Sequence, residues 1–263
     1  MKIMHRLPIP PERIAPSVLL LPGERHYLID VLRMSPGDAL EVFDGLGGRF
    51  PARIALADSR SSAAGSRETP VPSSSDVVLE IGERLPDEES GAEIGIAPAL
   101  IKNDRLDWAI EKATELGASV IAPWEGRNCV VHLDAKKGAE RCGRWQKLAQ
   151  SAARQCGRAF IPSVLPPSNL EGILRLASER GSLCVVLYER ETENALTQVV
   201  LKERDPSRPI LVVTGPEGGF REEEIALCRE NGAVTASLGR RILRAETAPI
   251  AALAAIRAVR GEM

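Results

Sequence analysis

The stretch ILVVTGPEGGFREEEIALCREN at residues 210–231 decides the fold class of this chain. Its apolar, β-branched start, Ile210–Thr214, is typical of a strand that is buried on both faces of a parallel sheet. A glycine-rich loop follows, and Glu222–Asn231, with three glutamates in its first turn, is typical of a helix. Strand, loop and helix in this order predict an α/β domain.

The same alternation continues on both sides of this stretch. The further expected strands are Ile94–Ala99, Val120–Pro123, Leu183–Tyr188 and Val234–Leu238. The further expected helices are residues 103–116, capped by Asn103 or Asp104, then Ala139–Cys156 and Pro249–Arg260. Alternating strands and helices predict a mostly parallel sheet that is covered by helices.

Residues 1–75 have a different texture. Short strand-like runs occur at Val18–Leu21, Ala39–Phe43 and Phe50–Leu56, with a hairpin signal at Asp44-Gly45 and a short helix expected at Tyr27–Arg33. They predict a small β-barrel-like module. The Ser-, Ala- and Pro-rich stretch Ala57–Asp76 is interpreted as a flexible connection. We therefore expect one domain over residues 1–75, with this connection at its end, and a second over 76–263.

Composition narrows the class of protein. Apolar residues make up 44% of the chain and charged residues 27%, and the formal net charge is −2. No run approaches the roughly 20 apolar residues that span a bilayer, and no secretory signal is visible, so we expect a cytoplasmic protein. The five irregularly spaced cysteines favour reduced thiols. Cys129 and His132 have the spacing of metal ligands, but no second pair follows, so we expect no metal site.

Positive charge is concentrated in the segment Arg127–Arg158, whose local balance is 8 − 2 = +6. Arg144, Lys147, Arg154 and Arg158 can share one helical face, opposite the apolar side chains that would face the core. Such a stripe fits phosphate binding, and a merely solvated helix face fits it as well.

The glycine loop at 214–220 is a candidate cofactor loop. It lacks both the P-loop lysine and the G-x-G-x-x-G pattern, and its glutamates would repel a nucleotide phosphate. A neutral or cationic ligand fits better, and S-adenosylmethionine carries a sulfonium and an ammonium but no phosphate. A tight structural turn is the other interpretation.

A second candidate loop reads LGRRILRAETA at Leu238–Ala248. Ile242 and Leu243 could form an apolar wall for an adenine ring while the arginines face outward, and Thr247 is a plausible cap for the following helix. An amphipathic loop that only closes the sheet is the alternative.

GPEGGF at 215–220 together with LGRRILRAETA at 238–248 resembles the signature of the ribosomal RNA small-subunit uridine-N3 methyltransferases of the SPOUT superfamily. Three further stretches agree with this family: EKATELGA at 111–118, AARQCGR at 152–158 and HYLIDVLRMSPGDALEVFDGLGG at 26–48. The resemblance implies a PUA-like RNA-binding β-barrel domain followed by an α/β SPOUT domain with a trefoil knot. It also implies a homodimer, S-adenosylmethionine as cofactor and N3 of a uridine in 16S rRNA of the small ribosomal subunit as the methylated atom.

The resemblance and the charge pattern give the candidate site residues. The expected cofactor residues are Leu187, Tyr188, Glu189, Thr214, Gly215, Glu217, Gly218, Gly219, Leu238, Gly239, Ile242, Leu243 and Thr247. Arg158 and Arg244 are the catalytic candidates, because arginines can stabilise charge that develops on the uracil oxygens. Glu217 and Glu115 are possible general bases. The expected RNA-binding residues are Arg6, His26, Arg33, Arg127, Arg144, Lys147 and Arg154.

Two other functions stay open at this point. Another SPOUT RNA methyltransferase, acting on a ribose 2′-oxygen or on tRNA, would share the cofactor loops but alter a different atom. A non-catalytic RNA-binding assembly factor could retain the fold without the reaction.

Overall fold

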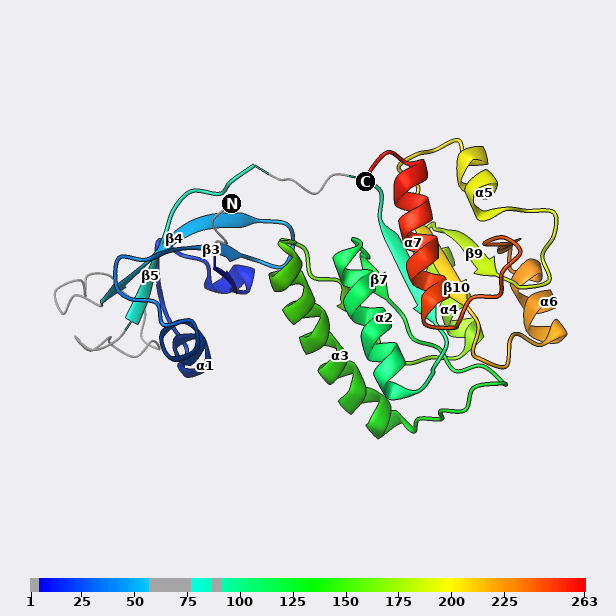
Figure 1. The fold of residues 1–263 in the computed structure, drawn as a ribbon, viewed down its shortest axis with the longest axis horizontal. Helices are drawn as coiled ribbons and strands as arrows, with labels where there is room; N and C mark the ends of the chain where they lie inside the picture. The colour runs from blue at the N-terminus through cyan, green and yellow to red at the C-terminus, as the bar shows by residue number, and fades with distance from the viewer. Residues whose placement is uncertain (1–4, 57–76, 87–90) are drawn as a thin grey trace. The chain divides into compact units, whose positions relative to one another are not determined.

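The computed structural model describes residues 5–56, 77–86 and 91–263 of the chain. The chain divides into two compact units, Met1–Glu89 and Ser90–Met263, which are drawn in Figure 1. Each unit has a hydrophobic core of its own, so each is described by itself. Among the described residues, none of the helices combines the length and the apolar character that crossing a bilayer requires.

The N-terminal unit is built on a five-stranded sheet with the order β1-β3-β4-β5-β2. Its strands are β1 (Arg6–Pro8), β2 (Ser17–Leu19), β3 (Ala39–Phe43), β4 (Arg49–Leu56) and β5 (Val77–Ile81). Strands β1 and β3 pair in parallel, and the other pairs are antiparallel. The core of this unit includes Leu28, Val42, Ile54 and Leu79, each at most 1% exposed. Barrel closure stays a prediction.

The expected hairpin between β3 and β4 is confirmed, with Phe43 opposite Arg49. Its turn is stabilised by the Asp44 carboxylate, which accepts the N–H groups of Leu46 and Gly48 at 2.7 and 2.8 Å. The helix expected at 27–33 is instead the short helix α1 (Pro22–Arg25) followed by a π-helical turn, η2 (His26–Val31). A 3-10 turn, η1 (Pro11–Arg13), completes the unit.

Strand β5 corrects the expected domain boundary. We expected the second domain to begin at residue 76, but Val77–Ile81 pairs with β4 and β2 inside the N-terminal sheet. The boundary between the units therefore lies at 89/90. The serine-rich stretch obscured this strand, because it separates β5 from its partner β4 along the sequence; residues 57–76 themselves lie outside the described part of the chain.

The C-terminal unit is the α/β domain that the sequence predicts. Its six strands are all parallel and have the order β11-β9-β10-β6-β7-β8. The strands are β6 (Ile94–Pro98), β7 (Val120–Ile121), β8 (Ser163–Val164), β9 (Leu183–Leu187), β10 (Ile210–Thr214) and β11 (Val234–Ala236). The helices are α2 (Asn103–Glu115), α3 (Ala135–Cys156), α4 (Leu170–Glu179), α5 (Leu196–Lys202), α6 (Glu222–Glu230) and α7 (Thr247–Val259).

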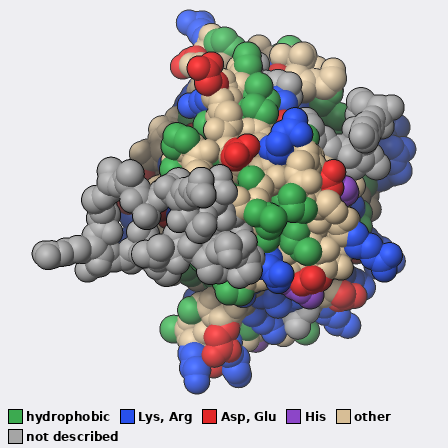
Figure 2. Space-filling view, turned by 90° about the vertical axis from the view of Figure 1, so that its left-hand side faces the viewer, with side chains coloured by type: hydrophobic (Ala, Val, Ile, Leu, Met, Phe, Trp, Pro, Cys, Tyr) green, Lys and Arg blue, Asp and Glu red, His purple; other side chains and the backbone are tan. Residues whose placement is uncertain are grey.

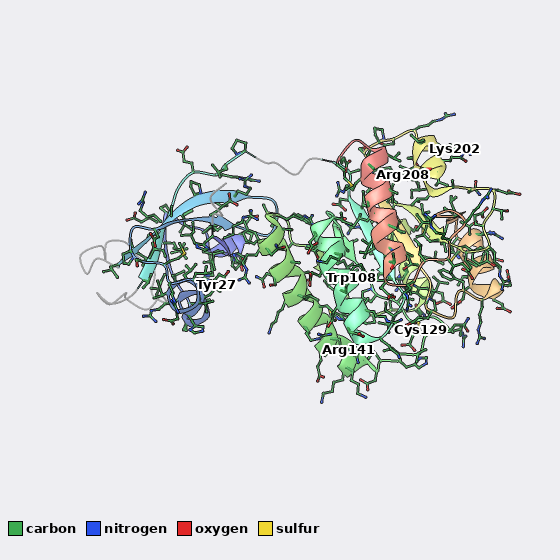
Figure 3. All side chains as sticks on the ribbon, in the orientation of Figure 1. Tyr27, Trp108, Cys129, Arg141, Lys202 and Arg208 are labelled. Atoms are coloured by element: carbon green, nitrogen blue, oxygen red, sulfur yellow. The ribbon has the colours of Figure 1, made fainter. Side chains whose placement is uncertain are left out.

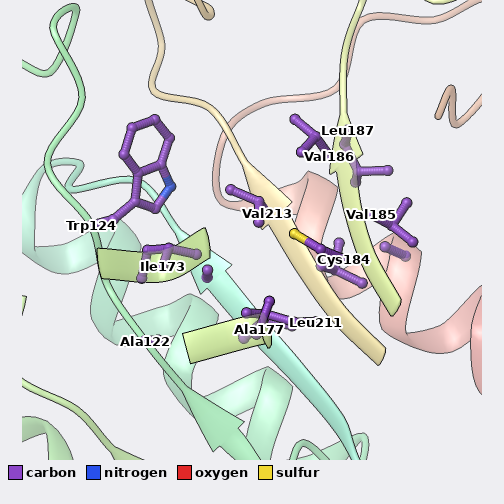
Figure 4. Close-up of a cluster of buried hydrophobic side chains, with 14 of the residues drawn as sticks. Ala122, Trp124, Ile173, Ala177, Cys184, Val185, Val186, Leu187, Leu211 and Val213 are labelled. Atoms are coloured by element: carbon purple, nitrogen blue, oxygen red, sulfur yellow. The ribbon is translucent and has the colours of Figure 1, made fainter. Parts of the chain in front are cut away.

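Helix α7 covers β6 and β10 and lies beside α2, while α4 packs on β9. The central strands β9 and β10 are buried along their whole length, as their apolar sequences predict. Figure 4 shows Val185, Leu187 and Val213 from these strands in one cluster with Ile173 and Ala177 of α4. Strand β8 and helices α4 and α5 were not expected from the sequence.

Helix α3 begins earlier than expected and ends before Arg158, the last residue of the basic stripe that the sequence predicts. Its N-cap is Asp134, whose side chain accepts the Lys137 N–H at 2.8 Å, so the helix starts at Ala135 and not at Ala139. Gly157, with φ of 88°, ends it after Cys156. The expectation that Arg158 shares a helical face with Arg144 is therefore wrong.

Trp124 ties the segment after β7 to the end of β10. Its indole N–H donates to the Thr214 carbonyl at 3.0 Å, and its ring stacks on Phe220 with the centroids 5.5 Å apart. Both rings are buried, at 0% and 7% exposure. Because Thr214 and Phe220 flank the glycine loop, Trp124 anchors both ends of that loop.

We predict that Trp124→Phe lowers the free energy of unfolding by about 1–3 kcal/mol, because it removes a buried hydrogen bond and part of a large side chain. Urea denaturation followed by circular dichroism measures this loss. The matched control is Trp108→Phe on α2, whose side chain is labelled in Figure 3 and is 43% exposed, so that a change within about 0.5 kcal/mol is expected. Equal effects of the two substitutions would contradict the anchoring role.

The five cysteines are free thiols, in agreement with the sequence analysis. Burial raises the pKa of Cys184 on β9 to about 12 and that of Cys228 on α6 to about 11. Cys156 at the end of α3 is exposed.

We therefore predict selective alkylation of the folded protein by iodoacetamide at pH 8. Since only the thiolate reacts, a raised pKa leaves Cys184 and Cys228 protonated and unreactive, while Cys156 is labelled. Peptide mass spectrometry of native and urea-unfolded protein reads out the difference, and all five cysteines should react after unfolding. Labelling of Cys184 in the native state as fast as Cys156 would refute the prediction.

Candidate cofactor site

A pocket of about 630 Å³ lies where three neighbouring parallel strands end. Thr214 of β10 and Ala236 of β11 are both in register with Leu187 of β9, so the three carboxyl ends lie at one level of the sheet. The pocket is lined by the segments that follow these ends, at 187–189, 214–219 and 236–246. This edge of an open parallel sheet is where ligands ordinarily bind.

The structure brings the two motif loops together at this pocket, although they are separate in the sequence. The expected cofactor residues that line it are Leu187, Tyr188, Glu189, Thr214, Gly215, Glu217, Gly218, Gly219, Leu238, Gly239, Ile242 and Leu243. The catalytic candidate Arg244 lines it as well.

Thr247 is the expected cofactor residue that does not line the pocket. It is the first residue of α7, and the N-cap position belongs to Glu246, whose side chain makes no capping hydrogen bond. The expectation that Thr247 caps this helix is therefore wrong. The α-helical backbone angles of Glu246, φ −72° and ψ −29°, show that the turn of α7 starts before the threonine.

Packing requires one of the loop glycines and backbone conformation requires another. A Cβ atom on Gly218 would lie 2.9 Å from the Cβ of Asn128. Gly219 has φ of 69°, and a Cβ there would lie 2.8 Å from a carboxylate oxygen of Glu189. A side chain on Gly218 would push the loop away from Asn128. At Gly219 the positive φ is the constraint, since the Glu189 carboxylate is the end of a flexible side chain that can move aside.

Asn128 holds the glycine loop by its side-chain amide. Its Nδ2 donates to the carbonyls of Gly218 and Gly219 at 3.2 and 3.1 Å, and its Oδ1 accepts from Arg221 Nε at 3.2 Å. The backbone N–H of the preceding residue, Arg127, donates to the Glu224 carboxylate at 3.0 Å. Asn128 is not predicted from the sequence, because no spacing pattern connects residue 128 to residue 218.

Arg105 of α2 is a second site residue that the sequence did not reveal. Its guanidinium lines the pocket, 3.6 Å from a carboxylate oxygen of Glu217 and 3.9 Å from one of Glu246. One cation thus lies between acidic side chains of both loops. It offsets their mutual repulsion and draws the loops together.

Two buried oxygen atoms in this pocket lack hydrogen-bond partners among the described residues: Thr214 Oγ1 and Glu246 Oε2. Buried polar atoms are nearly always paired in native proteins, so an orphaned pair in a pocket indicates a ligand that supplies polar groups. Glu189 and Glu217 are exposed in the same pocket, which favours a ligand that carries positive charge.

Tyr188 closes the pocket beside β9. Its hydroxyl lies 3.1 Å from a carboxylate oxygen of Glu222, to which it donates. Burial and this carboxylate raise the pKa of Tyr188, which keeps the phenol protonated and able to donate.

Arg158 does not line the pocket. Its side chain is buried, and its Nη1 donates to the carbonyls of Thr114 and Ala118 at 2.8 and 3.0 Å. The guanidinium also lies over the Phe160 ring, 5.7 Å from the centroid. These contacts close the C-terminal end of α2, which is a structural role; its catalytic role stays a prediction.

The RNA-binding candidates of the N-terminal unit differ in exposure. Arg6 is largely buried, with Nε donating to Glu41 at 2.7 Å and the guanidinium 4.8 Å from the Phe43 centroid. His26 is exposed, and its Nδ1 lies 2.9 Å from Asp30. Arg33 is exposed and has a left-handed backbone, with φ of 56°.

The RNA-binding candidates of the C-terminal unit also differ in exposure and pairing. Arg144 is exposed but makes a two-pronged ion pair with Asp107, at 2.7 and 2.6 Å. Arg127 and Lys147 are exposed, and Arg154 is half-buried. Figure 2 looks from the left-hand side of Figure 1, the side of the N-terminal unit, and the basic side chains seen from there are interspersed with acidic ones. RNA binding by these residues stays a prediction.

Comparison with known proteins supports the family resemblance. A model of the RNA methyltransferase domain matches residues 88–257, and a model of the RNA methyltransferase PUA domain matches residues 22–63. The chain is 33% identical to ribosomal RNA small subunit methyltransferase E of Bacillus subtilis, over 92% of this chain and 90% of that protein. The Synechocystis protein of that name is 30% identical, over 97% and 78% of the two chains.

A solved structure agrees with this assignment. Ribosomal RNA small subunit methyltransferase E of Neisseria gonorrhoeae, bound to S-adenosyl methionine, superposes with a TM-score of 0.79 at 30% identity, covering 97% of each chain. The α/β domain and the PUA-like domain expected from the resemblance are confirmed by these matches. The chain therefore belongs to the RNA methyltransferase family that includes ribosomal RNA small subunit methyltransferase E.

Proposed function

We propose that this protein transfers a methyl group from S-adenosylmethionine to N3 of a uridine in 16S rRNA of the small ribosomal subunit. The observation that carries the proposal is the pocket between the two motif loops, with its unpartnered Thr214 Oγ1 and Glu246 Oε2. In this proposal the protein acts in the cytoplasm as a homodimer, without a metal. The loops at the pocket would form the trefoil knot, and the N-terminal sheet would close as a barrel.

The pocket residues fit this cofactor. Glu189, Glu217 and Glu246 give the pocket acidic groups that suit a sulfonium and an ammonium. Leu187, Leu238 and Leu243 supply apolar surface for an adenine ring, and the glycines allow close backbone approach. Thr247 would act from the start of α7. When bound, S-adenosylmethionine supplies the methyl group as an electrophile.

The remaining chemistry belongs to the side chains around the uracil. Uridine N3 must lose its proton, and negative charge then spreads onto O2 and O4. Arg244 is exposed at the pocket and has several donors for these oxygens. Between the two candidate bases, the geometry favours Glu217, which lines the pocket. Glu115 does not line it, and its carboxylate lies 2.7 Å from Lys112 Nζ.

The direct test uses small ribosomal subunits from a strain that lacks this modification. We expect the purified protein and S-adenosylmethionine to produce one 3-methyluridine in 16S rRNA, detected by mass spectrometry of nuclease digests. A 2′-O-methyl product would identify another SPOUT activity. Cofactor binding without any methylated product, or no binding by calorimetry, would leave an RNA-binding assembly factor.

We predict that Arg244→Ala lowers the methylation rate, whereas Arg158→Ala lowers the stability of the fold. Removing Arg244 should lower the single-turnover methylation rate by about 10²–10³ while leaving the unfolding free energy within about 0.5 kcal/mol of the parent. Removing Arg158 should lower the unfolding free energy by about 2–3 kcal/mol, because two buried carbonyls lose a charged donor.

The same two variants decide whether Arg158 has a catalytic role. A folded Arg158→Ala protein that binds cofactor normally but transfers methyl 10²-fold more slowly, on the order expected for a lost donor, would establish one. Arg244→Lys keeps the charge and loses the planar fork, so we expect an intermediate rate. A wild-type rate in Arg244→Ala would remove that residue from the mechanism.

A further inference from the structure

Three arginines on the loop after β11 have no partner within the described residues. Arg240, Arg241 and Arg244 are exposed and line the pocket, and their guanidinium groups make no hydrogen bond or ion pair in the part of the chain that the structure describes. Many other arginines of this unit are paired: Arg144 binds Asp107, and Arg190 binds Glu222 at 2.7 Å. Unpaired cations are thus concentrated within five residues at the mouth of the site.

The residue between these cations is apolar and protrudes into solvent. Ile242 is 85% exposed, the highest value among the large hydrophobic side chains that are exposed in the described residues. Its side chain adds nothing to the core and costs solvation free energy where it stands. An exposed apolar side chain flanked by unpaired guanidinium groups matches a surface that contacts both a base and its phosphates.

We infer that Arg240, Arg241 and Ile242 form a substrate clamp that holds the RNA strand around the target nucleotide. In this assignment, which rests on the proposed function, the two guanidinium groups bind backbone phosphates next to the methylated residue. The Ile242 side chain packs on a base that has left its stack, while its backbone stays part of the cofactor pocket. Arg244 remains the residue directed at the uracil.

The charge balance of the pocket favours RNA over the cofactor as the ligand of these two arginines. S-adenosylmethionine has a single carboxylate and two cationic centres, so it offers little to a row of guanidinium groups. Of the three acidic side chains that line the pocket, Glu217 and Glu246 have Arg105 between them, and Glu189 makes no ion pair with these arginines in the described structure. A polyanion outside the pocket is the remaining partner of matching charge, and aromatic residues, only 3% of the chain, offer few alternative platforms for a base.

The test measures binding to small ribosomal subunits that lack the modification, at KCl concentrations from about 50 to 200 mM. For Arg240→Ala/Arg241→Ala we expect affinity on the order of tenfold weaker at the middle of this range, and a slope of log K against log salt that is smaller by about 1.4, because two phosphate contacts on a single strand are lost. Ile242→Ser should weaken binding without changing the slope, since its contact is apolar. The matched control is Arg204→Ala, an exposed arginine after α5 that does not line the pocket.

Cofactor affinity, measured by calorimetry on the same proteins, separates this inference from the proposed function. The clamp is supported if the double variant binds S-adenosylmethionine within about twofold of the parent while the salt slope falls. It is overturned if the slope is unchanged, if Arg204→Ala has the same effect, or if cofactor affinity falls in parallel, which would place the arginines in the cofactor site. It is also overturned if the substitutions alter only self-association, which would make the loop a contact between two copies of the chain. If the parent protein does not methylate the RNA but the salt slopes are as expected, the proposed reaction is wrong and the clamp remains an RNA contact.

Discussion

Parallel pairing of β9, β10 and β11 in register brings three chain segments to one edge of the sheet. Thr214 and Ala236 are both opposite Leu187, so the segments that follow them begin at the same level. The strands are almost wholly apolar and are buried on both faces, so their register is held by backbone hydrogen bonds and by packing against α4 and α7. Every feature of the pocket depends on this alignment, because none of its loops forms a site alone.

Contacts from outside the sheet then fix the loops. Trp124 anchors the ends of the glycine loop, and the Asn128 side-chain amide donates hydrogen bonds to the carbonyls of Gly218 and Gly219 inside the loop. Gly218 must be a glycine because a Cβ there would clash with the Cβ of Asn128. The sequence suggests that this glycine serves the cofactor, but close packing explains it equally directly. Arg105 adds an electrostatic link between the glycine loop and the loop after β11. Preorganised loops of this kind reduce the ordering that a ligand would otherwise have to impose.

The arginines of this chain show why residue type alone does not identify a role. Arg158 and Arg6 were grouped with the functional cations, yet Arg158 is buried and bonded to carbonyls at the end of α2, and Arg6 is largely buried and bonded to Glu41. Arg240 and Arg241 are exposed and have no partner in the described residues, although their sequence context resembles that of Arg244. Burial and pairing separate arginines that stabilise the fold from those available to a phosphate, and both properties depend on the neighbours in space.

The sequence by itself determined the α/β class, the two motif loops and the family, because apolar periodicity and glycine placement are local properties of the chain. It also predicted most of the pocket lining. It did not reveal Asn128, Arg105 or the membership of β5 in the N-terminal sheet, since each depends on a contact between segments far apart along the chain. Gly157 in a left-handed conformation ends α3 before Arg158. The role of that arginine follows from the carbonyls to which it donates there. Tertiary structure decided these points because hydrogen bonds and ion pairs depend on distance in space, which spacing along the chain does not encode.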